Sequence, residues 1–178
     1  EFPAHTFDEL FEGIKKIPWS EFLPKDAQVH VFSKCLFSAL MSDRTVQSIS
    51  KKAILESLKK VYKLEQFPET GVEFKIHVEV LHDQARILLD SSGAGLHKRG
   101  YRAEAGEAPL RETIAAAMVI LSRWSPPYPL LDPFCGSGTI PIEAALIGAN
   151  MAPGLKRAFA AEEWGFLDQS LWQKERAT

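Results

Sequence analysis

The sequence has few cysteines, no long apolar segment and no excess of charge of one sign. Cys35 and Cys135 are its two cysteines, and they are far apart, without the spacing of metal ligands. A disulfide scaffold and a cysteine-bound metal site are therefore excluded, and a reduced, cytoplasmic protein is expected. No run approaches the roughly 18 apolar residues that a transmembrane helix needs, and the N-terminus has no signal-peptide pattern. The formal net charge of -2 confines any nucleic-acid-binding surface to a local patch.

The composition is that of a globular protein. Of the 178 residues, 46% are hydrophobic and 25% are charged, which suits one ordinary domain or two small ones. The apolar periodicity of the first half indicates an α+β module. The expected helices are residues 7–17 and 45–62, and the expected strands are residues 28–33, 74–80 and 85–90.

Local signals support these elements. Thr6 and Glu9 stand at capping-box spacing before the first helix. The buried face of the second helix is expected to contain Val46, Ile49, Ala53, Ile54, Leu58 and Val61. The last two strands are expected to form a hairpin. Residues 91–95 are the best linker in the sequence, so we expect two domains, 1–93 and 94–178.

The second half has the pattern of the opening of an α/β unit. It combines an alanine-rich helix over residues 110–124, a short strand over 128–134 and a helix over 140–147. Asp132 lies near the end of the expected strand, and Gly136 and Gly138 let a ligand approach the backbone closely. The N–H groups at the start of the next helix favour a carboxylate or a phosphate.

Three classes of ligand compete for this strand–turn–helix. A nucleoside triphosphate would need the lysine of a P-loop, and no Gly-Lys-Ser/Thr is present. A dinucleotide would need a third glycine, and Pro141 occupies that position. S-adenosylmethionine carries an ammonium group and a carboxylate on one arm, which matches an aspartate beside a Gly-x-Gly turn. A glycine turn without any ligand is the alternative for the bare Gly-x-Gly.

The whole motif resembles a known family. Residues 132–139, Asp-Pro-Phe-Cys-Gly-Ser-Gly-Thr, resemble motif I of the methyltransferases that modify exocyclic amino groups of nucleobases. Residues 96–102 and 108–113 resemble segments of the bacterial THUMP-domain RNA methyltransferases. The closest likeness is to the group that methylates guanine N2 in large-subunit ribosomal RNA, often labelled N6-adenine-specific DNA methylases. Residues 7–11 with Trp19, and residues 46–54, resemble the THUMP module of that group.

The resemblance implies a fold, a cofactor and a site. The fold is an α+β THUMP-like RNA-binding module followed by the start of an α/β Rossmann-like methyltransferase domain, and the cofactor is S-adenosyl-L-methionine. The residues expected to line its site are Asp132, Phe134, Cys135, Gly136, Ser137, Gly138 and Thr139. Related enzymes often contact the methionine arm from the preceding helix, which here begins with Pro109, Leu110, Arg111 and Glu112. A solvated charge pair is the alternative for Arg111 and Glu112.

The catalytic motif IV of this family is expected beyond Thr178. Residues 125–128, Ser-Pro-Pro-Tyr, have its form, but they lie too close to Asp132 for the chain to reach another strand and return. We therefore interpret them as a helix stop. Both ends of the chain are expected to lie within a longer protein, and residues 1–178 alone are predicted to be inactive.

RNA is the expected partner. Residues 44–63 carry six basic side chains and one acidic one, a local net charge of +5. The residues expected to bind RNA phosphates are Lys51, Lys52, Lys98, Arg99 and Arg102. A solvated helix face is the alternative. The rival functions are an N6-adenine DNA methyltransferase, a non-catalytic RNA-binding protein if Thr178 is a native end, and, last, a dinucleotide-dependent oxidoreductase.

Overall fold

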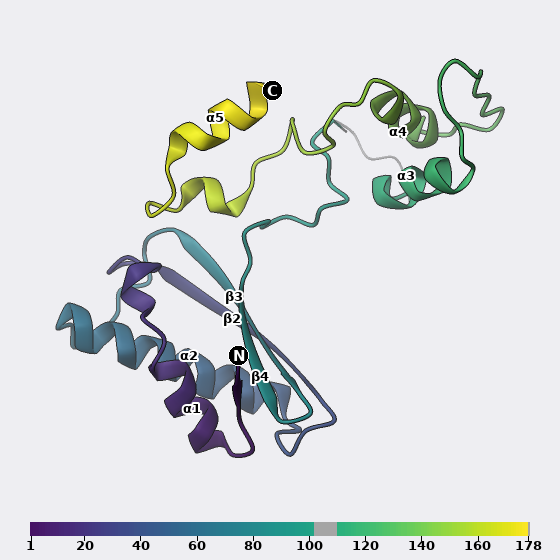
Figure 1. The fold of residues 1–178 in the computed structure, drawn as a ribbon. Helices are drawn as coiled ribbons and strands as arrows, with labels where there is room; N and C mark the ends of the chain where they lie inside the picture. The colour runs from purple at the N-terminus through teal and green to yellow at the C-terminus, as the bar shows by residue number, and fades with distance from the viewer. Residues whose placement is uncertain (102–109, 178) are drawn as a thin grey trace. The chain divides into compact units, whose positions relative to one another are not determined.

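The computed structural model describes residues 1–101 and 110–177 of the chain (Figure 1). The chain divides into two compact units, and each is described by itself. The first contains residues 1–93 and 160–172, and the second contains the described residues of 94–159 and 173–178. No helix in the described part of the chain is long and apolar enough to cross a membrane.

The first unit is built on a four-stranded sheet. Its strands are β1 (Phe2–Pro3), β2 (Gln28–Leu36), β3 (Glu73–Leu81) and β4 (Gln84–Leu89), in the spatial order β1-β4-β3-β2. β2 and β3 are parallel over their whole length, which explains why β2 is longer than the predicted strand over residues 28–33. β3 and β4 form the predicted antiparallel hairpin. His82 and Asp83 turn it with φ angles of 49° and 58°, as a two-residue type I′ turn requires.

Two helices cover one face of this sheet (Figure 1). They are α1 (Phe7–Lys15) and α2 (Asp43–Tyr62), and a short 3-10 helix follows α1 at Trp19–Glu21. The predicted capping box is confirmed, because Thr6 Oγ1 accepts the Glu9 N–H at 3.2 Å and a Glu9 carboxylate oxygen accepts the Thr6 N–H at 3.3 Å. Burial alternates along β2 and β3: every second residue, from Val29 to Val31 and from Phe74 to Val80, is buried, and the residues between them are half-buried or exposed.

One residue of the predicted α2 face was placed wrongly. Val61 is 55% exposed, whereas Val46, Ala53, Ile54 and Leu58 are buried. In the last turn the contact is made by Tyr62 instead, whose hydroxyl donates to the Leu23 carbonyl oxygen at 2.8 Å. Periodicity identified the correct stripe, but the aromatic residue next to it reaches the neighbouring loop.

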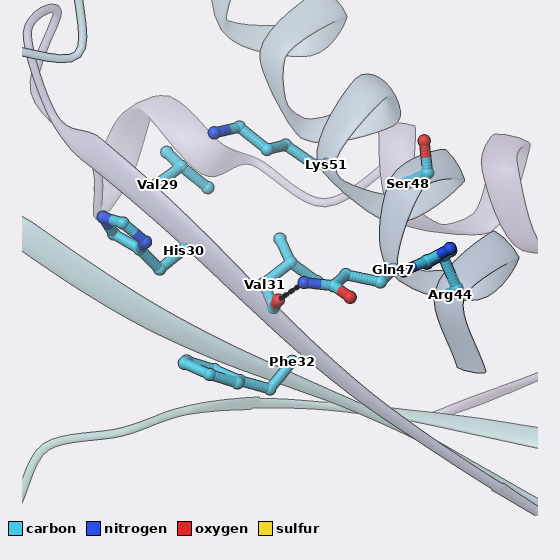
Figure 2. Close-up of a pocket in the computed structure, with 8 residues that line it drawn as sticks. All are labelled: Val29, His30, Val31, Phe32, Arg44, Gln47, Ser48 and Lys51. Carbon is cyan, nitrogen blue, oxygen red and sulfur yellow. Dashed lines mark hydrogen bonds between the residues drawn. The ribbon is translucent and has the colours of Figure 1, made fainter.

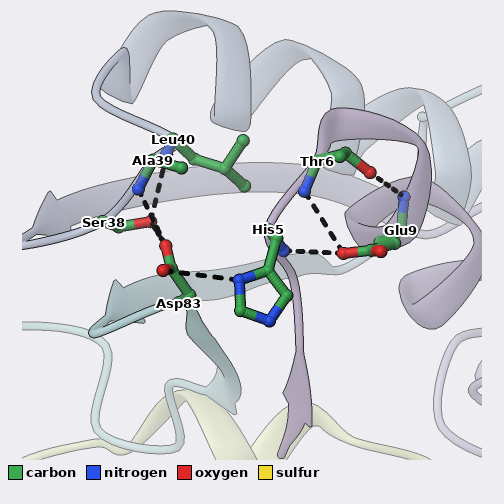
Figure 3. Close-up of polar contacts among 7 residues, drawn as sticks. All are labelled: His5, Thr6, Glu9, Ser38, Ala39, Leu40 and Asp83. Carbon is green, nitrogen blue, oxygen red and sulfur yellow. Dashed lines mark hydrogen bonds and ion pairs between the residues drawn. The ribbon is translucent and has the colours of Figure 1, made fainter.

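The β3–β4 turn is tied to two other segments by the carboxylate of Asp83 (Figure 3). It accepts a hydrogen bond from Ser38 Oγ at 2.7 Å and one from the Ala39 N–H at 2.7 Å, and His5 Nδ1 lies 3.4 Å away. The Ser38 hydroxyl in turn accepts the Leu40 N–H at 3.0 Å. The hydrogen bond from Ser38, followed by that from Ala39, lowers the pKa of Asp83 below its ordinary value.

A lowered folded-state pKa makes the stability of the first unit depend on pH. The Asp83 contribution is complete above the unfolded-state pKa and is lost as the pH falls through the lower folded-state pKa. We expect Asp83→Asn to lower the melting temperature at neutral pH and to flatten the acid limb of the melting curve. Glu65→Gln, an exposed change of the same kind, is the control. Equal acid limbs in Asp83→Asn and wild type would contradict this role.

The first unit also contains residues from late in the sequence. Residues 160–172 begin with a 3-10 helix (Ala160–Glu163), and Ala161 and Trp164 are buried in the core. The Trp164 ring stacks on Phe74 with their centroids 5.7 Å apart. The Ala161 N–H donates to the Ser91 carbonyl oxygen at 3.1 Å. The place of this segment in the core of the first unit was not predicted from the sequence.

The second unit contains α3 (Glu112–Leu121) and α4 (Thr139–Gly148), which pack against each other, while the polar helix α5 (Gln169–Ala177) spans residues of both units. α4 matches the predicted helix over residues 140–147. α3 is shorter than the predicted residues 110–124, because Arg111 is its N-cap and Arg123 adopts a left-handed φ of 58°. Ala115 and Val119 of α3 are buried.

The predicted strand over residues 128–134 is wrong. These residues form turns and irregular backbone, and Leu131 and Phe134 are 87% and 93% exposed. A strand needs hydrogen bonds from a neighbouring strand. All strand pairing within the described residues lies between residues 2 and 89. An apolar run indicates that a segment can be buried, and the pairing decides whether it becomes a strand.

Candidate functional site

Residues 132–139 form a tight turn that leads into α4. Asp132 is half-buried, and its Oδ1 accepts the Phe134 N–H at 3.2 Å. The Gly138 N–H donates to the Cys135 carbonyl oxygen at 2.8 Å, and the hydroxyls of Ser137 and Thr139 lie 3.0 Å apart. These contacts give the turn a defined shape without any strand before it.

The two glycines of this turn adopt backbone conformations that residues with a side chain rarely adopt. Gly136 and Gly138 have φ angles of 53° and 72°. Among the described residues, a Cβ at Gly136 would meet nothing within 4 Å, and one at Gly138 would meet Ile142 at 3.8 Å. The space over the turn is therefore open, so a ligand can lie directly on the backbone.

The start of α4 suits an anionic group. Gly138 is the N-cap, and no side chain caps the helix. The first N–H groups and the positive end of the helix dipole therefore point toward the turn. The residues present fit one end of a cofactor that carries a carboxylate and an ammonium group, with α4 facing the carboxylate and Asp132 supplying the acceptor.

The helix that carries this turn is held by a buried carboxylate. Glu143, in the second turn of α4, is 2% exposed. The Tyr101 hydroxyl donates to one of its oxygens at 2.9 Å, and the Arg99 guanidinium lies 3.5 Å from the other. Between these two partners, Gly100 has a φ of 82°, and a Cβ there would collide with the Lys156 carbonyl oxygen. The basic segment around Gly100 therefore packs onto α4.

A second buried cation forms hydrogen bonds with the start of this segment, at residues 94–98. Arg157 is 6% exposed, and it donates to the carbonyl oxygens of Ala94, Gly95 (3.1 Å) and Lys98 (3.5 Å). Arg157 and Glu143 were not predicted because charged residues are usually assigned to the surface. Their burial is the structural signal that they hold residues 94–101 in place.

Of the four residues predicted to contact the methionine arm of the cofactor, Pro109 to Glu112, the structure describes three. Leu110 and Arg111 are exposed, and Glu112, in the first turn of α3, is 5% exposed, so Glu112 is buried rather than solvated. Pro109 lies outside the described residues. Because α3 packs on α4, these residues and the glycine turn belong to one unit.

The predicted RNA-binding residues separate into different environments. Lys51 Nζ pairs with Glu69 at 2.7 Å, whereas Lys52 Nζ lies 3.9 Å from Glu56 and 5.9 Å from the centre of the Phe11 ring. Lys98 is exposed. The Arg99 side chain is 13% exposed and turned toward Glu143, and Arg102 lies outside the described residues.

A groove follows β2, which is an edge strand, where it meets α2 (Figure 2). We call it the edge groove; it is lined by Val29, His30, Val31, Phe32, Arg44, Gln47, Ser48 and Lys51. Gln47 Nε2 donates to the Val31 carbonyl oxygen at 2.7 Å. Arg44 and Lys51 belong to the predicted basic stretch, but the neutral lining residues could not be found before the register of β2 beside α2 was known.

No metal centre is found among the described residues, and the thiol of Cys35 is not a reactive one. No cluster of His, Cys, Asp or Glu among them could hold a metal ion. Burial, followed by a hydrogen bond to Asp43, raises the pKa of the Cys35 thiol to about 11, which leaves it protonated and unreactive. Cys135 is exposed on the glycine turn.

Comparisons with known proteins match both halves of the chain. Residues 4–90 match the THUMP domain family, and residues 99–178 match the family described as RMKL-like, methyltransferase domain. The chain is 52% identical over 177 residues to the candidate RNA methyltransferase YpsC of Bacillus subtilis, covering 98% of this chain and 46% of that protein. It is 37% identical to the ribosomal RNA large subunit methyltransferase K/L of Photobacterium profundum, covering 97% of this chain and 24% of the relative.

Solved structures agree over nearly the whole chain. A protein from Listeria monocytogenes described as a predicted N6-adenine-specific DNA methylase matches with a TM-score of 0.93 and 50% identity, over 99% of this chain and 47% of that one. SMU.472, a candidate methyltransferase complexed with SAH, matches with a TM-score of 0.89 and 46% identity, over the same shares. The chain spans less than half the length of these relatives. The chain therefore combines a THUMP domain with a segment of an RMKL-like methyltransferase domain, in that order.

Proposed function

We propose that the complete gene product is an S-adenosylmethionine-dependent RNA methyltransferase that methylates N2 of a guanine in large-subunit ribosomal RNA. The main observation that supports this proposal is the glycine turn at the start of α4. The space over Gly136 and Gly138 is open, and the Asp132 carboxylate lies beside it in the same turn. The identity to a relative named as a ribosomal RNA large subunit methyltransferase supports the substrate. The cytoplasm, where ribosomal RNA is found in bacteria, is the proposed location.

The cofactor would be held by the residues of the turn. The relative SMU.472 was solved with SAH, the product that remains after S-adenosylmethionine gives up its methyl group. In this chain Asp132 would accept the ammonium group, the start of α4 would face the carboxylate, and Gly136 and Gly138 would let the cofactor lie on the backbone. Phe134, Cys135, Ser137 and Thr139 complete the proposed lining, and Leu110 to Glu112 are proposed to reach the methionine arm.

The reaction asks the protein for positioning more than for covalent chemistry. S-adenosylmethionine would supply an electrophilic methyl group for direct transfer to an exocyclic amino nitrogen, which would leave SAH and release a proton from that nitrogen. The rate then depends on holding the two reactants in line and excluding water. The target base must leave its stack to reach the cofactor. Residues 1–93 are the proposed RNA-binding module, and residues 94–178 are proposed to open the catalytic domain.

A second candidate function is N6-adenine methylation of DNA, which is favoured by the description of the Listeria monocytogenes relative. One experiment separates the two. The complete gene product is incubated with methyl-labelled S-adenosylmethionine and either large-subunit ribosomal RNA or genomic DNA. We expect label in the RNA alone. Transfer to DNA alone would establish the rival, and transfer to neither would overturn both.

A further inference from the structure

We propose that the edge groove binds an unpaired RNA strand, with phosphates at Arg44 and Lys51 and a base on the ring of Phe32. This inference rests on the proposed RNA methyltransferase function and adds the place where the THUMP domain holds the substrate. It also separates the basic residues of α2 into those that bind RNA and those that do not, because Lys51 is part of the groove and its neighbour Lys52 is not.

The cations of the groove are spaced along one side of α2. Arg44 and Lys51 are seven residues apart, which is two helical turns, or about 10 Å along the axis. Arg44 is exposed. The side chains of Lys51 and Glu69 are 38% and 28% exposed, and an ion pair so open to water is weak enough for a phosphate to replace the carboxylate.

The other charged side chains near the groove form ion pairs with one another. His30 Nε2 lies 3.7 Å from Glu73, and Glu73 also pairs with Lys75 at 3.3 Å. Glu69 accepts the Val29 N–H at 3.3 Å as well as the Lys51 ammonium. Glu69 is therefore the carboxylate that an RNA phosphate would displace from Lys51.

Beside the apolar Val29 and Val31, the groove contains one polar side chain that is held in a fixed position. The side-chain amide of Gln47 is held by the Val31 carbonyl, and Figure 2 shows its oxygen pointing away from that hydrogen bond. Ser48 lies one residue further along α2 and is exposed. An amide oxygen and a hydroxyl between two cations are groups that can hydrogen-bond a base edge or a ribose hydroxyl.

An aromatic platform lies on the other side of the edge strand. Figure 2 shows Phe32 across β2 from Gln47 and Lys51. The Phe32 ring is 45% exposed and stacks on His77 with the centroids 5.2 Å apart and an interplanar angle of 21°. A base can stack on such a ring only when it is not enclosed in a duplex. A strand that crosses the β2 edge would thus have phosphates on one side and a base on the other.

Binding of a fluorescent, single-stranded RNA of about 12 nucleotides to the 178-residue chain tests this inference. The groove variant is Arg44→Gln/Lys51→Gln. The matched control is Lys52→Gln/Lys60→Gln, which removes the same charge from exposed positions of the same helix. We expect the groove variant to bind about tenfold more weakly at ~0.1 M salt and to lower the salt-dependence exponent by about 1.4, the value for two phosphates on a single strand. The control should change the affinity by less than about threefold.

Two further variants separate stacking from charge. Phe32→Leu keeps an apolar side chain but removes the aromatic face, so we expect affinity to fall about tenfold with an unchanged salt exponent. Glu69→Gln keeps an acceptor for the Val29 N–H and releases Lys51, so we expect tighter binding. Melting temperatures of all variants show that the fold is retained.

The outcomes distinguish this inference from the proposed function. Equal losses in the groove and control variants would overturn the groove while leaving RNA binding intact. Equal binding of duplex RNA or polyglutamate, with no effect of Phe32→Leu, would show a plain basic surface and overturn it too. If the groove variants behave as expected but the complete gene product transfers no methyl group to RNA, the groove stands and the proposed function fails.

Discussion

Gly136→Ala is expected to abolish most methyl transfer by the complete gene product without unfolding it. No described residue lies within 4 Å of where the new Cβ would be, so the fold loses only the cost of a left-handed alanine, about 1 kcal/mol. A cofactor lying on the backbone would occupy that space and be displaced. A displacement of this size costs on the order of a hundredfold in kcat/KM. Calorimetric titration with S-adenosylmethionine should show the loss directly.

Gly136→Asn separates the two causes of such a loss. Asparagine tolerates the left-handed φ of 53° at this position but also carries a Cβ. If the cofactor occupies the space, both variants lose cofactor affinity. If only the alanine variant loses it, backbone strain is responsible. Full cofactor affinity in both variants would contradict the placement of the cofactor over this turn.

Glu143→Ala is expected to destabilise the second unit more than any other single change in its described part. The substitution leaves the guanidinium of Arg99, which is 13% exposed, without its carboxylate and leaves the Tyr101 hydroxyl without that acceptor. Removing one partner of a buried ion pair costs about 3 kcal/mol or more. Amide hydrogen exchange in α4 should therefore accelerate by roughly two orders of magnitude, since local opening follows the same free energy.

A double variant shows whether the pair itself stabilises the unit. Arg99→Leu/Glu143→Leu removes both charges, and we expect it to be much closer to wild type in α4 exchange than Glu143→Ala, because no charge is left buried and unpaired. Exposed Glu175→Ala is the control for loss of one carboxylate. Unchanged exchange in Glu143→Ala would show that residues 99–101 are held to α4 by something else.

The sequence predicted the first unit well because its signals are local. The capping box at Thr6 and Glu9, the apolar stripe of α2 and the alternation in β3 each depend on neighbours a few residues away. The pairing of β2 with β3 and its full length depend on residues about 45 positions apart, as in Gln28 with Glu73, which periodicity does not encode. The return of Trp164 to this core is a contact of the same long-range kind.

The glycine turn could be predicted because all of its residues are consecutive in the sequence, from 132 to 139. The strand predicted before the turn is wrong because residues 128–134 have no neighbouring strand to pair with within the described residues, and an apolar run does not reveal whether such a partner exists. Arg99 was expected on an RNA-binding surface because it belongs to a basic segment with Lys98 and Arg102. The structure turns it toward Glu143, 44 positions away, and no pattern in the sequence joins the two.

Nucleoside mass spectrometry after methyl transfer tests the central claim most directly. Large-subunit ribosomal RNA from a strain that lacks the gene is incubated with the complete gene product and S-adenosylmethionine, digested, and its methylated nucleosides are identified. The account predicts a new N2-methylguanosine in the RNA, absent from reactions with the Gly136→Ala variant. A methylated adenine as the only product, or no methylated nucleoside at all, would contradict it.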